Sequence, residues 1–146
     1  MEPILKVADL SKAFSRAGRD AFFAVDHVSF EVQPGEILGI VGESGSGKST
    51  IARLITRQID TTGGQIFIDG QDITRLRGRD LIPVYEKIQM VFQSPADSFD
   101  PRRTLGDGIC ESLRNKGVPK AEREAKARAL LESCGLPDTF LARYPH

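Results

Sequence analysis

Apolar and polar positions alternate near the start of the chain, which predicts two strands joined by a polar connection. The first covers residues 4–14 and the second residues 21–32, and the alternation is strict over residues 28–32. Residues 33–36, Gln-Pro-Gly-Glu, predict a tight turn, because proline presets φ and glycine accepts positive φ. Residues 36–41 are almost continuously apolar, which predicts a strand buried on both faces.

Helical spacing replaces this pattern after residue 47. The apolar residues that recur at this spacing are Ile51, Leu54, Ile55 and Ile59. They predict a helix that begins at about Lys48 and closes by Gly63 and Gly64. A short strand is expected over residues 64–70, and its last two residues, Asp-Gly, predict a turn. Another strand is expected over residues 87–92.

The remainder of the chain predicts helices. Thr104 and Asp107 resemble a capping box, and the apolar spacing that follows predicts a helix as far as Gly117. Pro119 is suited to start the next helix and Gly135 to stop it. A short helix is expected over residues 138–143.

Composition adds limits to this picture. The chain has 146 residues, enough for one domain with a real core, and its 20 basic and 20 acidic residues balance. This balance gives no bulk attraction to nucleic acid, so no nucleic-acid partner is expected. No apolar run approaches the length of a bilayer, and the first residues lack the pattern of a secretory signal. Cys110 and Cys134 stand singly in helical patterns, which predicts buried thiols in a cytosolic protein.

Residues 42–50 carry the clearest chemistry. They read Gly-Glu-Ser-Gly-Ser-Gly-Lys-Ser-Thr, the G-x-x-x-x-G-K-S pattern of a phosphate-binding P-loop. Glycines let backbone N–H groups approach phosphate oxygens, and the following helix directs its positive end at the same anion. Lys48 adds a mobile cation with a catalytic role, and the Ser49 hydroxyl can bind the accompanying Mg²⁺. A glycine-rich turn with an incidental lysine is the alternative, and the predicted flanking strand and helix disfavour it. The predicted nucleotide-binding residues of this loop are Gly42, Ser44, Gly45, Ser46, Gly47, Lys48, Ser49 and Thr50.

A basic stretch that follows the predicted 64–70 strand has two interpretations. Arg75, Arg77 and Arg79 surround Gly78 within the polar residues 71–81. They could form a basic surface that contacts phosphate or a partner. Nearby aspartates offset them and no aromatic residues interleave, which favours a solvated helix face.

Four segments, taken in order along the chain, make it resemble a known family. Residues 28–37 resemble the strands that precede the P-loop, or Walker A motif, of an ABC transporter ATPase subunit. Residues 88–93, Ile-Gln-Met-Val-Phe-Gln, resemble the Q-loop strand of that family. Residues 100–104, Asp-Pro-Arg-Arg-Thr, resemble the importer branch for oligopeptides, dipeptides and nickel, and residues 143–146 resemble the stretch before the family's signature motif. The resemblance covers essentially the whole chain.

The resemblance implies roles for two residues outside the P-loop. Phe14 matches the aromatic that stacks on adenine; the alternative is a core aromatic at a strand end, with Phe22 and Phe23 as nearby competitors. Gln93 matches the glutamine that reaches the Mg²⁺ and the attacking water, which is both a metal-binding and a catalytic role. The alternative for Gln93 is a solvated loop residue.

The resemblance also implies a fold. It is an α/β P-loop ATPase core with an N-terminal antiparallel β subdomain and the start of a helical subdomain, with the C-terminal part of the domain missing. The expected division places the nucleotide-binding core in residues 1–93 and the Q-loop with the partial helical subdomain in residues 94–146.

The implied function is the ATP-binding part of an importer that takes up peptides or related solutes such as nickel. Its cofactors would be ATP and Mg²⁺. Residues 93–117 would face transmembrane permease subunits, a second ATPase subunit would complete the assembly, and the protein would lie on the inner face of the cytoplasmic membrane. The signature motif, the Asp-Glu pair with its general base and the switch histidine do not occur in the sequence. We therefore expect this chain to bind Mg-ATP without hydrolysing it. The alternatives are a non-catalytic protein that binds nucleotide or a partner and, more weakly, a small-molecule kinase.

Overall fold

The computed structural model describes residues 2–15, 21–94 and 98–145. The chain forms two compact units, Met1–Met90 and Val91–His146. The expected division after residue 93 lies close to this boundary.

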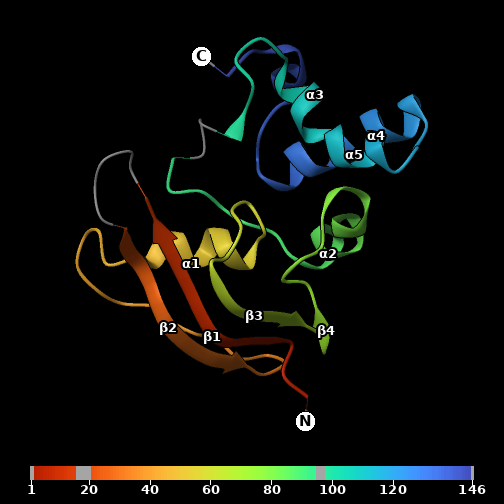
Figure 1. The fold of residues 1–146 in the computed structure, drawn as a ribbon. Helices are drawn as coiled ribbons and strands as arrows, with labels where there is room; N and C mark the ends of the chain where they lie inside the picture. Colours follow the sequence, from red (N-terminus) through yellow and green to blue (C-terminus); the bar gives the residue numbers. More distant parts are fainter. Residues whose placement is uncertain (1, 16–20, 95–97, 146) are drawn as a thin grey trace. The chain divides into compact units, whose positions relative to one another are not determined.

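The first unit is built on an antiparallel sheet whose strands stand in the order β2-β1-β3-β4 (Figure 1). Its strands are β1 (Leu5–Phe14), β2 (Phe22–Val32), β3 (Gly63–Ile68) and β4 (Gln71–Asp72). The predicted first, second and 64–70 strands are therefore confirmed within a few residues. The predicted turn at residues 33–36 is confirmed as well, since the Glu36 N–H donates to the Gln33 carbonyl at 3.0 Å.

Helix α1 (Lys48–Ile55) packs against one face of this sheet (Figure 1). Its buried residues Ile51 and Leu54 meet a core formed by alternate strand residues. The short helix η1 (Gly78–Leu81) and helix α2 (Ile82–Lys87) each add one residue to that core. The buried core residues are Val7, Leu10, Val25, Ile51, Leu54, Ile66, Ile68, Ile73, Leu81 and Val84.

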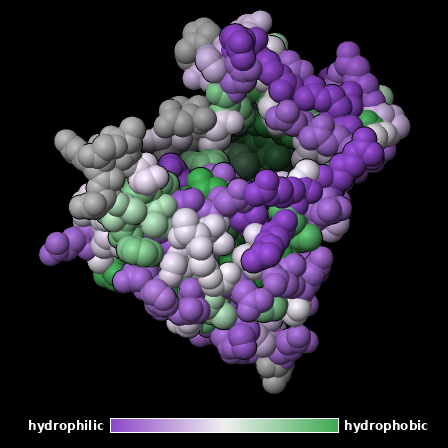
Figure 2. All heavy atoms as spheres, viewed as in Figure 1, coloured by the Kyte–Doolittle hydropathy of each residue, from purple (hydrophilic) through white to green (hydrophobic). Residues whose placement is uncertain are grey.

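Two predicted strands are wrong. Residues 36–41 and 88–92 are assigned no strand, and α2 already includes Lys87. A strand exists only when its backbone pairs with a neighbour, and in the described parts of the chain no strand lies beside either segment. Their apolar side chains consequently reach the surface, with Ile37 96% and Val41 95% exposed. The face shown in Figure 2 is mostly hydrophilic, with smaller apolar areas among the hydrophilic residues.

The expected helix face at residues 71–81 is also wrong. Residues 74–77 form a turn and its connection, and only residues 78–81 coil, as η1. Arg75 and Arg77 therefore lie in the turn region, outside any helix.

The second unit is helical. It contains α3 (Leu105–Ile109), α4 (Glu111–Asn115), α5 (Lys120–Ser133) and the short helix η3 (Asp138–Ala142). The predicted cap at Thr104 is confirmed, because its side chain accepts a hydrogen bond from the Asp107 N–H. The single helix expected up to Gly117 is divided into two at Cys110.

The prediction of buried thiols holds only in part for one cysteine and is wrong for the other. Cys110 is half-buried, whereas Cys134 follows the last residue of α5 and is exposed. None of the helices formed by the described residues is both long and apolar enough to span a bilayer.

Candidate nucleotide-binding site

The P-loop runs from Gly42 to the start of α1, and glycines shape its turns. Gly45 and Gly47 have φ values of 82° and 91°, a region that side chains disfavour. Gly47 also lies against strand β2, where an added Cβ would stand 2.2 Å from the Ala24 carbonyl oxygen. Only glycine allows the loop to pass this close to the sheet, so the loop lies directly against β2.

The N-terminus of α1 leaves backbone donors directed at the loop. The first intrahelical bond runs from the Ile51 N–H to the Gly47 carbonyl, at 2.9 Å. The N–H groups of Lys48, Ser49 and Thr50 therefore have no acceptor inside the helix. Unpaired N–H groups and the helix dipole together favour an anion at this position.

The Lys48 side chain folds back onto its own loop. Its ammonium donates to the carbonyl oxygens of Gly42 and Glu43, at 2.7 and 2.5 Å, and to the Ser46 hydroxyl at 3.2 Å. The sequence thus places a cation beside the turn that the glycines form. Ser49 is exposed on the first turn of α1, where its hydroxyl is open to a metal ion.

The three aromatic candidates lie where β1 and β2 meet the polar connection. Phe14 and Phe22 are cross-strand partners, and their rings stack with centroids 5.8 Å apart. The Lys12 ammonium lies 5.1 Å from the Phe14 centroid. None of the three aromatics is buried, with Phe14 37% exposed, so the alternative of a core aromatic is wrong.

Strand β2 carries Phe22 of the aromatic pair and also contacts the P-loop. Phe22 precedes Ala24, which contacts Gly47, by two positions on β2. At a strand rise of about 3.3 Å per residue, that spacing is roughly 7 Å. Sequence alone could not choose among the aromatics, and the structure presents Phe14 and Phe22 as one stacked unit.

Gln93 belongs to the second unit, and its side chain is exposed. The P-loop belongs to the first unit, and contact of Gln93 with Mg²⁺ and water stays a prediction. The adjoining residues 95–97 lie outside the described residues.

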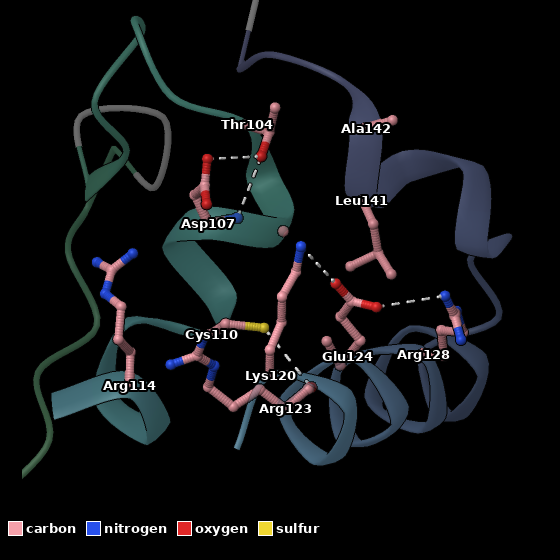
Figure 3. Close-up of a pocket in the computed structure, with 12 residues that line it drawn as sticks. Thr104, Asp107, Cys110, Arg114, Lys120, Arg123, Glu124, Arg128, Leu141 and Ala142 are labelled. Atoms are coloured by element: carbon pink, nitrogen blue, oxygen red, sulfur yellow. Dashed lines mark hydrogen bonds and ion pairs between the residues drawn. The ribbon is translucent and has the colours of Figure 1, made fainter. Parts of the chain in front are cut away.

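The second unit contains a hollow of about 360 Å³ between α3, α5 and η3 (Figure 3). Glu124 lies between Lys120 and Arg128, at 3.7 and 3.9 Å, and the Cys110 thiol donates to the Arg123 carbonyl at 3.6 Å. Sequence analysis did not predict the hollow, which forms only when three separate elements pack together. The lining residues are Thr104, Gly106, Asp107, Cys110, Arg114, Lys120, Arg123, Glu124, Ala127, Arg128, Leu141 and Ala142.

Comparison with known proteins gives relatives along nearly the whole chain. A Brucella ovis protein named for peptide import and ATP binding is 42% identical over 146 residues, 99% of this chain and 45% of the relative. The glutathione import ATP-binding protein GsiA of Escherichia coli O157:H7 is 43% identical over 153 residues, 99% of this chain and 24% of the relative. The chain thus spans less than half the length of these curated relatives.

Solved structures show the same fold. The ATP-binding cassette MJ0796, a dimer in a post-hydrolysis state bound to ADP and Pi, superposes with a TM-score of 0.84 and 27% identity. The match covers 97% of this chain and 61% of that one. The model of the ABC transporter family matches residues 25–145, which include the whole P-loop. On this match and this fold, the chain belongs to the ABC transporter family, as the resemblance implied.

Proposed function

We propose that this chain is the ATP-binding part of an importer that couples ATP hydrolysis to the uptake of peptides or related solutes, such as nickel. The observation that carries this proposal is the P-loop seated on β2, with the N-terminus of α1 and the Lys48 ammonium beside it. The names of the peptide and glutathione import relatives support the transported class.

The residues present fit a magnesium nucleotide. The loop comes so close to β2 at Gly47 that a Cβ there would overlap the Ala24 carbonyl oxygen. The first N–H groups of α1, which follow Gly47, have no acceptor within the helix and are available to an anion. Lys48 would hold the β- and γ-phosphates, with the loop from Gly42 to Thr50 around them. Mg²⁺ neutralises phosphate charge when bound, and Ser49 and Gln93 would supply oxygen ligands to it. The exposed rings of Phe14 and Phe22 would stack on the adenine.

The chain by itself would bind Mg-ATP and leave it intact. Phosphoryl transfer requires charge stabilisation and a placed water in addition to a phosphate cradle. The sequence motifs that supply these in the family do not occur among these residues. Residues 93–117 would contact the permease subunits, and a second ATPase subunit would complete the assembly at the inner face of the membrane.

Thermal melting with and without Mg-ATP tests this proposal. A ligand at a hundredfold excess over its dissociation constant adds about 2.7 kcal/mol to stability. We expect the chain to melt at a higher temperature with Mg-ATP, and Lys48→Ala to lose that shift. Lys126→Ala, at an exposed ion pair on α5, is the matched control and should keep it.

A parallel turnover assay separates the remaining alternatives. Release of phosphate at background rate, together with a Lys48-dependent shift, fits the proposal and also a non-catalytic binding protein. If hydrolysis appears when the chain is joined to the remaining residues of a relative's ATP-binding protein, the result favours the proposed role as part of an importer ATPase. Absence of any shift in the unmodified chain would refute nucleotide binding, and phosphate transfer to a small acceptor would point to a kinase.

A further inference from the structure

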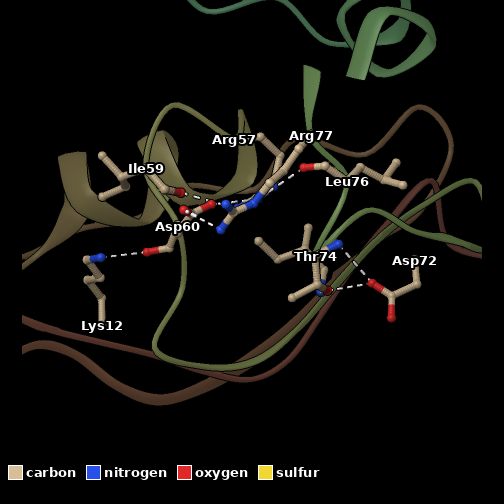
Figure 4. Close-up of polar contacts among 9 residues, drawn as sticks. Lys12, Arg57, Ile59, Asp60, Asp72, Thr74, Leu76 and Arg77 are labelled. Carbon is tan, nitrogen blue, oxygen red and sulfur yellow. Dashed lines mark hydrogen bonds and ion pairs between the residues drawn. The ribbon is translucent and has the colours of Figure 1, made fainter. Parts of the chain in front are cut away.

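The first unit also contains a hollow, which is polar and has a volume of about 400 Å³. No P-loop residue lines it. It lies between the end of α1, the start of β3 and the turn after β4, and Figure 4 shows most of its polar contacts. For the arginines of that turn, sequence analysis offered a basic surface that contacts phosphate or a partner and favoured a solvated helix face instead. The lining residues are Arg57, Asp60, Thr61, Thr62, Gly63, Gly64, Thr74, Arg75 and Arg77.

Arg57 is the unusual member of this lining. Its side chain is only 2% exposed, and it stands just after α1 with a φ of 55°. Its two terminal nitrogens donate to the carbonyl oxygens of Ile59 and Leu76, at 3.3 and 3.4 Å, and to the Asp60 carboxylate at 2.8 Å. Its Nε is buried and has no acceptor among the residues that the structure describes. A buried guanidinium with an unpaired N–H is costly unless negative charge lies close to it.

Asp60 is the only carboxylate among the described residues that line the hollow, and it interacts with more than Arg57. The Arg77 guanidinium also reaches the Asp60 carboxylate, at 3.3 Å, while the Lys12 ammonium donates to the Asp60 backbone carbonyl at 2.6 Å. Asp60 is largely exposed to solvent, which weakens its compensation of the buried cation. Of the charged lining residues that the structure describes, three are arginines and one is an aspartate, which leaves two more positive than negative charges.

Donors at the rim of the hollow remain open. Within the described chain, Arg75 donates no hydrogen bond, and Arg77 uses one terminal nitrogen on Asp60. Both guanidinium groups are exposed, so an incoming ligand can reach them. Arginine forks match the oxygens of phosphate in pairs, and such charge-assisted bonds are the strong class of hydrogen bond.

We propose that this hollow binds a phosphate-type oxyanion, with Arg75 and Arg77 as its direct ligands and Arg57 as the buried positive charge behind them. The anion would supply the negative charge that Asp60 alone provides incompletely. Two sources share this chemistry, free phosphate and the phosphate ester of a lipid headgroup. This inference stands apart from the nucleotide site, because none of residues 42–50 lines the hollow.

Amide NMR of the isotope-labelled chain, titrated with inorganic phosphate at constant ionic strength, tests the proposal. The Lys48→Ala background weakens phosphate binding at the P-loop, so signals of residues 61–64 report the hollow and signals of residues 45–47 report the loop. The double variant R75Q/R77Q removes the exposed ligands and leaves buried Arg57 and its contacts in place. R79Q is the matched control, an arginine of the same stretch that does not line the hollow.

We expect saturable shifts at residues 61–64 that R75Q/R77Q weakens by about tenfold or more, the loss of one or two charge-assisted bonds. R79Q should change that affinity by less than about twofold. Shifts at 61–64 that do not saturate, or that R79Q weakens as much as the double variant, would overturn the proposal.

Vesicles distinguish the two sources. If the ligand is a lipid headgroup, phosphatidylglycerol vesicles bind the chain, phosphate competes with them, and R75Q/R77Q abolishes binding, while phosphatidylcholine vesicles at the same lipid concentration bind less. If phosphate saturates the hollow and neither vesicle binds, the ligand is free phosphate.

Discussion

Replacing Gly47 by alanine tests the claim that the P-loop depends on close contact with β2. An L-residue at positive φ costs about 1–2 kcal/mol. The new Cβ would also stand 2.2 Å from the Ala24 carbonyl oxygen, far below the 3.0 Å that real Cβ atoms respect. Relief of that overlap requires a backbone shift, and overpacking of this kind costs about 1–3 kcal/mol more. We therefore expect G47A to lose about 2–5 kcal/mol of unfolding free energy.

Gly45 provides the matched control for this experiment. Its φ of 82° carries a similar conformational cost, but an added Cβ there meets nothing within 4 Å. Urea unfolding should show that G45A loses about 1–2 kcal/mol of unfolding free energy. G47A should be clearly less stable than G45A. G47A should also lose the thermal shift with Mg-ATP, because its loop can no longer lie on β2. Equal losses in the two variants would refute the role of the Ala24 contact, since strain from φ would then account for both.

Three further predictions concern local interactions. The Asp26 carboxylate, hydrogen-bonded to the His27 ring at 2.6 Å, raises the pKa of His27 above 6.5, with a smaller contribution from the charge of Asp9. The stabilisation that protonated His27 provides is fully present below the His27 pKa of the unfolded chain, and it is lost as pH rises through the His27 pKa of the folded chain. D26N should lower the His27 pKa in an NMR titration, and an unchanged pKa would contradict the role of Asp26. The Arg57 guanidinium, by its hydrogen bond, lowers the pKa of Asp60 below 3.8, so that stabilisation is present above that value and lost as pH falls through the folded pKa. D60N should flatten this part of the acid unfolding curve, and an unchanged curve would argue against it. T104A removes the side-chain oxygen that caps α3 and should cost about 0.5–2 kcal/mol in urea unfolding; T104S keeps that oxygen and should cost less.

Features set by neighbouring residues could be predicted from the sequence. The glycine pattern of residues 42–47 requires a tight loop, and the apolar spacing after it requires a helix with one buried face. The turn at residues 33–36 and the cap at Thr104 likewise depend only on residues a few positions apart. Each of these is a local interaction, so no knowledge of the remaining chain was needed.

Features that depend on partners distant in sequence could not be predicted this way. Residues 36–41 and 88–92 have the composition of buried strands, yet a strand forms only where another strand lies beside it. The sequence offered a phosphate contact at Arg75 and Arg77 only as the less favoured interpretation, for the same reason. No sequence pattern distinguishes Arg57, and only folding buries it beside the turn that carries Arg75 and Arg77.

The sequence by itself determined the phosphate-binding loop, its lysine and the helix behind it, because these groups are contiguous and their backbone geometry follows from residue type. The tertiary structure alone decided that the loop lies on Ala24 of β2 and that Phe14 stacks on Phe22. It also decided which arginines share a hollow. The physical reason is that close contact and burial arise between segments far apart in the chain, and local patterning specifies each segment without specifying which neighbour it meets.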